Sequence, residues 1–179
     1  MGEIKSTLDL VLKKTMHLSL SSEEKQELAV EDIEKRIKGM MQKYQDGILT
    51  LDELQNEYRV IKTDESLTAS RSMIKEIIGR LDLLKANGPL LEVLGKLCGS
   101  NTNGLQSVID ESLGIYRDAA RKRSDELKSI LVADHSISGS AVVPNLEADT
   151  QWRKEAWEIR SGFEDQLNRV KDNLLGDMS

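Results

Sequence analysis

The chain has 179 residues, of which 39% are hydrophobic, 31% are charged and only 3% are aromatic. A formal net charge of −6 and a pI near 5.1 argue against a nucleic-acid-binding surface, which needs clustered cations. Leu, Ile, Val and Phe make up about 27% of the residues, above the roughly 20% below which disorder is expected. The composition predicts a folded chain whose elements pack against each other through aliphatic side chains.

Charged residues interrupt every apolar segment, so no stretch approaches the roughly 18 uninterrupted apolar residues of a membrane span. The lone cysteine, Cys98, has no partner for an internal disulfide, and no signal peptide opens the chain. We therefore expect a soluble protein of the reducing cytoplasm, of bacterial type, with no membrane and no nucleic-acid partner.

The apolar spacing predicts an all-α fold: an elongated helical bundle with long, antiparallel, coiled-coil-like helices. We expect one domain over 1–179. Its predicted parts are helical hairpins over 2–62, central helices over 64–98, a long helix over 102–133, a loop over 134–148 and a long C-terminal helix over 149–176.

Apolar residues at helical spacing predict a first amphipathic helix over 4–18. Ser21 followed by Glu24 is a capping box, which predicts the start of a second helix. The apolar side of that helix comprises Val30, Ile33, Ile37, Met40 and Tyr44. Its opposite side carries four glutamates at helical spacing. We interpret them as surface charge rather than metal ligands, because Glu31 and Lys35 form an ordinary i, i+4 pair.

Gly47 suits the left-handed conformation that ends a helix, and Thr50 with Glu53 forms a second capping box. These residues predict a tight helical hairpin. The segment also matches the back half of a calcium-binding loop, but Gln42 and Tyr44 stand where carboxylates are required. We therefore expect no metal and no cofactor here.

Residues 41–62, with Gly-Ile-Leu-Thr followed by Asp-Glu-Leu, resemble the short helical hairpins of SHOCT-type domains, which bacteria attach to varied proteins. The resemblance covers about an eighth of the chain and differs from that family in lying near the N-terminus. It implies oligomerisation rather than catalysis.

The apolar spacing lapses at Thr63-Asp64, which predicts a break or bend, and then resumes as far as Leu84. Asn87-Gly88-Pro89 ends this helix, and a short apolar helix is predicted over 90–98. Cys98 has apolar neighbours and no adjacent histidine, so we interpret it as a buried structural thiol.

An apolar pattern from Leu105 to Ile130 predicts about 26 residues of helix, spanning about 39 Å. Arg123 falls on its apolar side, where it either snorkels past its neighbours or pairs with a carboxylate across an interface. The helical rhythm then stops. Residues 135–148 predict an irregular or β-like segment, with a possible short strand over 141–143. The residues there that we select as candidates for contact with a ligand or peptide are His135, Ser138, Gly139 and Ser140.

The last helix carries the clearest signal of the sequence, an apolar stripe that repeats after 11 residues and therefore favours nearly straight packing. Trp157 lies about 120° away from this stripe and either covers the preceding loop or reaches a second subunit. The candidate interface residues of this helix are Trp152, Trp157, Ile159, Phe163, Leu167 and Val170.

Assembly is the function that these patterns favour. The leading hypothesis is a non-catalytic interaction or scaffold protein. We expect it to form a homodimer, to bind another protein, or both. The alternative is a small regulatory binding module that uses the 135–149 loop. An enzyme is the third and least favoured hypothesis. The two histidines, His17 and His135, and the lone Cys98 form no recognisable catalytic pattern.

Overall fold

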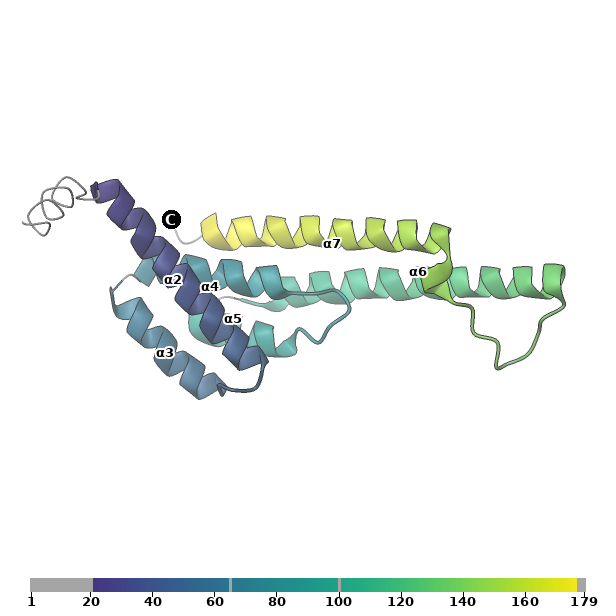
Figure 1. Cartoon of the computed structure of the whole chain (residues 1–179), viewed down its shortest axis with the longest axis horizontal. Helices are drawn as coiled ribbons and strands as arrows, with labels where there is room; N and C mark the ends of the chain where they lie inside the picture. Colours follow the sequence, from purple (N-terminus) through teal and green to yellow (C-terminus); the bar gives the residue numbers. More distant parts are fainter. Residues whose placement is uncertain (1–20, 65, 100, 177–179) are drawn as a thin grey trace, which may run out of the picture.

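The computed structural model describes residues 21–64, 66–99 and 101–176. The described chain is all helical and contains no strand (Figure 1). Its elements are α2 (Ser22–Gln45), α3 (Leu51–Asp64), α4 (Ser66–Arg80), α5 (Gly88–Cys98), α6 (Asn103–His135), the short 3-10 helix η1 (Leu146–Ala148) and α7 (Thr150–Gly176). The helix expected over 4–18 lies outside the described residues.

Helix α2 begins at the predicted capping box. The Ser21 amide donates to the Glu24 carboxylate at 2.7 Å, and the Glu24 amide donates to Ser21 Oγ at 3.1 Å. Ile33, Ile37, Met40 and Met41 are buried, whereas residues 22–32 are all exposed. Val30 was expected on the packed side but is 39% exposed, because α2 meets its neighbours only from Ile33 onward.

The predicted hairpin between α2 and α3 is confirmed. Gly47 has φ +71°, and the Thr50 amide donates to the Glu53 carboxylate at 2.8 Å while the Glu53 amide donates to Thr50 Oγ1 at 3.3 Å. The predicted break near Thr63-Asp64 is also confirmed, since α3 and α4 pack against each other, which one continuous helix could not do. Tyr58 and Ser70 join these two helices through a buried hydroxyl hydrogen bond of 3.2 Å.

Helix α4 ends four residues earlier than the sequence predicts. Residues 81–87 form a turn instead, in which Asn87 Nδ2 donates to the Asp82 carbonyl at 2.8 Å and the Asp82 amide donates to Asn87 Oδ1 at 3.1 Å. Leu81 and Leu83 are still buried. The apolar spacing therefore continues beyond the end of the helix. In this turn the two hydrogen bonds between Asn87 and Asp82, which we call the Asn87 clamp, replace helical hydrogen bonds.

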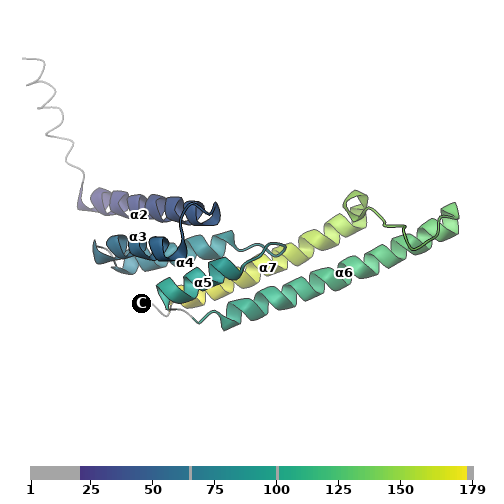
Figure 2. The same cartoon turned by 90° about the horizontal axis from the view of Figure 1, so that it is seen from below.

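Helix α4 lies at the centre of the core and packs against α2, α3, α5 and α7 (Figure 2). The helix predicted over 90–98 is confirmed as α5, which ends at Cys98 and is capped by Gly99 with φ +65°. The largest fully buried side chains on these central helices are Met73, Ile74 and Ile77 of α4 and Val93 and Leu94 of α5.

Helix α6 leaves this core, and α7 returns alongside it (Figures 1 and 2). We refer to α6, α7 and the connecting residues 136–149 as the α6–α7 hairpin. At 33 residues, α6 is longer than its apolar pattern predicts and spans about 50 Å. Its far end extends past the first turn of α7 (Figure 1).

The connecting segment contains no strand, so the β-like segment expected near 135–148 is not found. Residues 139–142 form a turn closed by a hydrogen bond of 3.2 Å from the Val142 amide to the Gly139 carbonyl, and η1 follows. Val143 is 84% exposed. A strand needs a neighbour to satisfy its backbone, and this segment has none within the described chain.

Candidate interaction surface

Arg123 fixes the start of α7 to the middle of α6. Its Nε and Nη2 atoms donate to the two carboxylate oxygens of Asp149 at 2.9 and 2.8 Å, and its Nη1 donates to Glu126 at 2.9 Å. The side chains of Arg123 and Asp149 are only 12% and 17% exposed. Of the two roles that the sequence leaves open for Arg123, the structure shows carboxylate pairing, and the partner belongs to the same chain.

Asp149 also stabilises the first turn of α7, because its Oδ1 accepts the Trp152 amide hydrogen at 2.6 Å. The hydrogen bonds from Arg123, and then that from the Trp152 amide, lower the pKa of the Asp149 carboxyl below its ordinary value. The hydrogen bonds of Arg123 to Asp149, and then to Glu126, raise the pKa of the Arg123 guanidinium. One charged pair thus closes the α6–α7 hairpin and caps α7.

Aromatic packing continues from this junction toward the core. Trp152 is buried and meets Tyr116 of α6 edge to face, with ring centroids 5.2 Å apart and an interplanar angle of 67°. The guanidinium carbon of Arg160 lies 5.7 Å from the centroid of the same Tyr116 ring. Trp152, selected from the sequence as an interface residue, therefore packs inside this chain.

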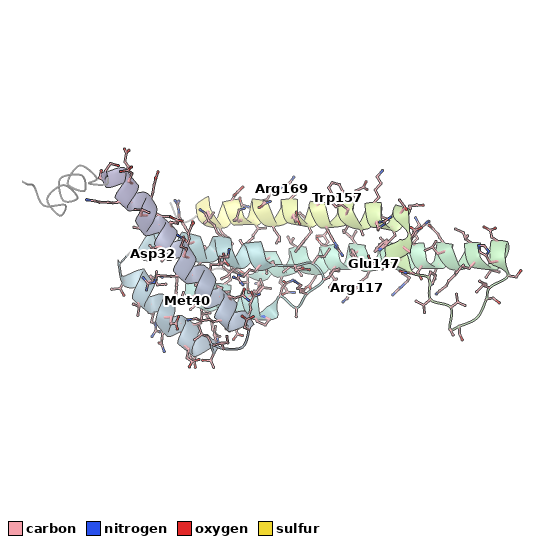
Figure 3. The ribbon with its side chains drawn as sticks, viewed as in Figure 1. Asp32, Met40, Arg117, Glu147, Trp157 and Arg169 are labelled. Atoms are coloured by element: carbon pink, nitrogen blue, oxygen red, sulfur yellow. The ribbon has the colours of Figure 1, made fainter. Side chains whose placement is uncertain are left out.

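The other candidates on α7 divide into inner and outer positions. Phe163 and Leu167 are buried in the core, and Ile159 and Val170 pack against it while remaining partly exposed. Trp157 is 68% exposed. Figure 3 shows it on the side of α7 that faces away from α6. Trp157 is thus the one candidate on this helix whose side chain is largely available to a partner.

The outer side of α7 combines Trp157 with charges of both signs. Arg153 and Lys154 precede the tryptophan by one turn, while Glu164 and Asp165 follow it by two. All four charged residues are exposed. Lys154 lies 4.0 Å from Glu158, the long limit of an ion pair, and neither acidic residue forms an ion pair with any described residue. The apolar stripe of the sequence does not reveal this distribution, because these charged residues lie outside it.

The loop candidates occupy the far end of the α6–α7 hairpin. His135 is the last residue of α6, and Ser138, Gly139 and Ser140 follow in the connection. All four are exposed. Gly139 has φ +135°, a conformation that residues with a side chain rarely adopt. These residues are close in sequence, but within the described chain no side-chain hydrogen bond or ion pair joins them into a preformed pocket.

Cys98 ends α5 and is half-buried against the core. Burial raises the pKa of its thiol to about 11, with a small opposing effect from Lys62. The thiol is therefore protonated near neutral pH, which agrees with a structural role. The described residues include no group of three or more His, Cys, Asp or Glu side chains placed to hold a metal ion.

Comparison of the chain with models of known families, with curated proteins and with solved structures finds no match. The resemblance of residues 41–62 to SHOCT-type hairpins therefore carries no family assignment. Among the described residues, no helix combines the length and apolarity needed to cross a membrane. Inferences about function accordingly depend on the geometry alone.

Proposed function

We propose that this chain is a non-catalytic interaction protein that self-associates through its α6–α7 hairpin, in an elongated helical bundle with coiled-coil-like antiparallel pairing. The observation that carries the proposal is surface area. The chain exposes 12415 Å², whereas a compact monomer of 20.1 kDa exposes about 8,700 Å². The excess exceeds the roughly 1,600 Å² that a standard protein interface buries in total.

The exposed apolar side chains of the α6–α7 hairpin support the same proposal. Half of the large hydrophobic residues that the described chain exposes belong to it: Ile115, Ile130, Val132, Ile137, Val143 and Trp157. Single exposed hydrophobic residues are ordinary. Here they accompany a segment only two helices thick, which has no core of its own to bury them (Figure 2).

The placement of the reactive side chains supports a non-catalytic role. Cys98 lies just before α6 and His135 ends it, so the length of α6, about 50 Å, separates the thiol from the imidazole. A nucleophile and its base act within hydrogen-bonding distance. His17 lies outside the described residues.

Sedimentation equilibrium of the full chain from about 1 to 100 μM tests self-association. We expect a mass approaching twice 20.1 kDa as the concentration rises. A mass that stays at 20.1 kDa throughout this range contradicts the proposal. Affinity capture from a bacterial lysate with mass spectrometry then asks whether the dimer serves a larger cytoplasmic assembly.

A second candidate function is peptide or ligand binding by the 135–149 loop, favoured by the exposure of Val143 and Ile137 at 84% and 47%. Substitution of His135 or Gly139 then abolishes partner capture while the far-ultraviolet circular dichroism spectrum is unchanged. Capture that survives both substitutions removes this candidate.

A further inference from the structure

The outer side of α7 has the charge pattern of a surface that binds a copy of itself. Between Arg153 and Asp165, six residues share an arc of about 120° on the side of this helix opposite the packed stripe. They are Arg153, Lys154, Trp157, Ser161, Glu164 and Asp165, and we call them the outer face of α7. The cations lie at one end, the carboxylates at the other, and Trp157 lies between.

This order makes the outer face self-complementary under a two-fold rotation. When two copies of α7 pack antiparallel about a point level with Ile159, residues on the same edge of the outer face meet. Lys154 then faces the partner's Asp165, and Arg153 faces the partner's Glu164. In the same register, Trp157 covers the partner's Ser161, a small residue that leaves room for an indole ring. A parallel arrangement would instead oppose like charges at both ends.

We propose that two copies of this chain associate through the outer faces of their α7 helices, antiparallel, with Trp157 as the anchor. The inference rests on the proposed self-association and adds its surface, register and orientation. Three observations support it: the 68% exposure of Trp157, the acidic residues without an ion pair in the described chain, and the surface excess of the chain. Tryptophan is the side chain most enriched among interface anchors.

Charge reversal in the full chain tests the register directly. Lys154→Glu places two carboxylates opposite each other at both ends of the interface, and Asp165→Lys places two cations there. Each single variant should weaken dimerisation roughly tenfold in sedimentation equilibrium, because the change occurs twice in each dimer. The double variant K154E/D165K should return the dissociation constant to within about threefold of wild type, since opposite charges again face each other.

Two further variants separate the outer face from general effects. Arg169→Glu changes the net charge as Lys154→Glu does, at an exposed position of α7 outside the arc of the outer face, and should leave the dissociation constant unchanged. Trp157→Ala removes the anchor and should weaken dimerisation about 30-fold or more. Circular dichroism should show unchanged helicity for all variants, because these side chains are exposed.

Each result decides between the two proposals. A wild-type chain that stays monomeric contradicts both self-association and this interface. A wild-type dimer that tolerates Trp157→Ala and both single reversals overturns the outer face alone. Failure of the double reversal to restore the dimer, or equal weakening by Arg169→Glu, overturns the pairing of Lys154 with the partner's Asp165.

Discussion

Arg123 donates two parallel hydrogen bonds to Asp149 although 26 residues separate them along the chain. Parallel bonds of this kind fix the orientation of both side chains as well as their distance. Because Asp149 also accepts the Trp152 amide, the residue that closes the α6–α7 hairpin is the one that starts its second helix.

Asp149→Asn keeps an oxygen that can cap α7 but removes the charge, whereas Asp149→Ala removes both. We expect the melting temperature to fall by a few degrees in the Asn variant and by more in the Ala variant, with faster amide exchange in the first turn of α7. Circular dichroism melts and hydrogen exchange measure these effects. Asp134→Asn removes an exposed carboxylate near the end of α6 and should melt as wild type does. Equal melting of all three variants would show that the pair contributes nothing.

Acid should destabilise the fold through two carboxylates. The pKa of Asp149 is lowered by Arg123 and the Trp152 amide, and the pKa of Glu53 is lowered by its hydrogen bonds with Thr50. A carboxyl whose pKa is lower in the folded state stabilises the fold above its unfolded pKa, with ordinary values of 3.8 for Asp and 4.5 for Glu. This contribution is lost as the pH falls through the lower folded pKa.

Melting temperatures measured from pH 7 down to pH 2 should therefore decline most steeply below about pH 4. The Asp149→Asn variant should decline less over the same interval, because one of the two linked protons is absent. A decline in this variant as steep as that of the wild type would contradict the assignment to Asp149.

The Cys98 thiol should react slowly in the native protein. With its pKa raised to about 11, the thiolate fraction at pH 8 is about 100-fold lower than for a thiol with the ordinary value of 9.0. We expect reaction with Ellman's reagent to be slower by at least this factor in buffer than in urea. Native labelling as fast as that of the unfolded chain would show that the thiol is accessible and ionised.

The same shift predicts the effect of alkaline pH on stability. The folded state keeps the thiol neutral, while the unfolded state loses the proton above its ordinary pKa. The free energy of unfolding should therefore decrease as the pH rises above about 9, and Cys98→Ala should remove that part of the decrease. Urea titrations at pH 7, 9 and 10 compare the two proteins.

Asn87→Ala should destabilise the core by about 1–3 kcal/mol in urea denaturation, because it leaves the amide and the carbonyl of Asp82 without their partners. Asn87 is only 6% exposed, so water does not readily replace its side chain. Lys85→Ala breaks a surface ion pair of 3.5 Å in the same turn and should cost less than about 0.5 kcal/mol. Equal effects of the two substitutions would contradict the role of the clamp.

Local chemistry made most helix boundaries predictable. The capping boxes at Ser21 and Thr50 and the positive φ of Gly47 each follow from residues at most three positions apart. The early end of α4 was not predictable from the apolar spacing, because Leu81 and Leu83 remain buried in the turn that the Asn87 clamp forms. A single side-chain pair there outweighs periodicity.

The candidate surface was predictable only in part. The sequence places Trp157 off the packed stripe, and the structure leaves it exposed, but the burial of Trp152 depends on Tyr116, a residue of another helix. The partner of Arg123 also depends on how far α7 returns along α6. Such contacts join distant parts of the chain, so a pattern within one helix does not determine them.

Helix α6 is continuous, but only its beginning packs into the core. Leu105, Ile109 and Ser112 are buried at its beginning, whereas residues 124–149, all within the described chain, include no buried side chain. The distal third of α6 can therefore unfold as far as Arg123 without exposing the core to water. We therefore expect the protein to melt in at least two stages along a single helix, with the guanidinium of Arg123 at the boundary between them.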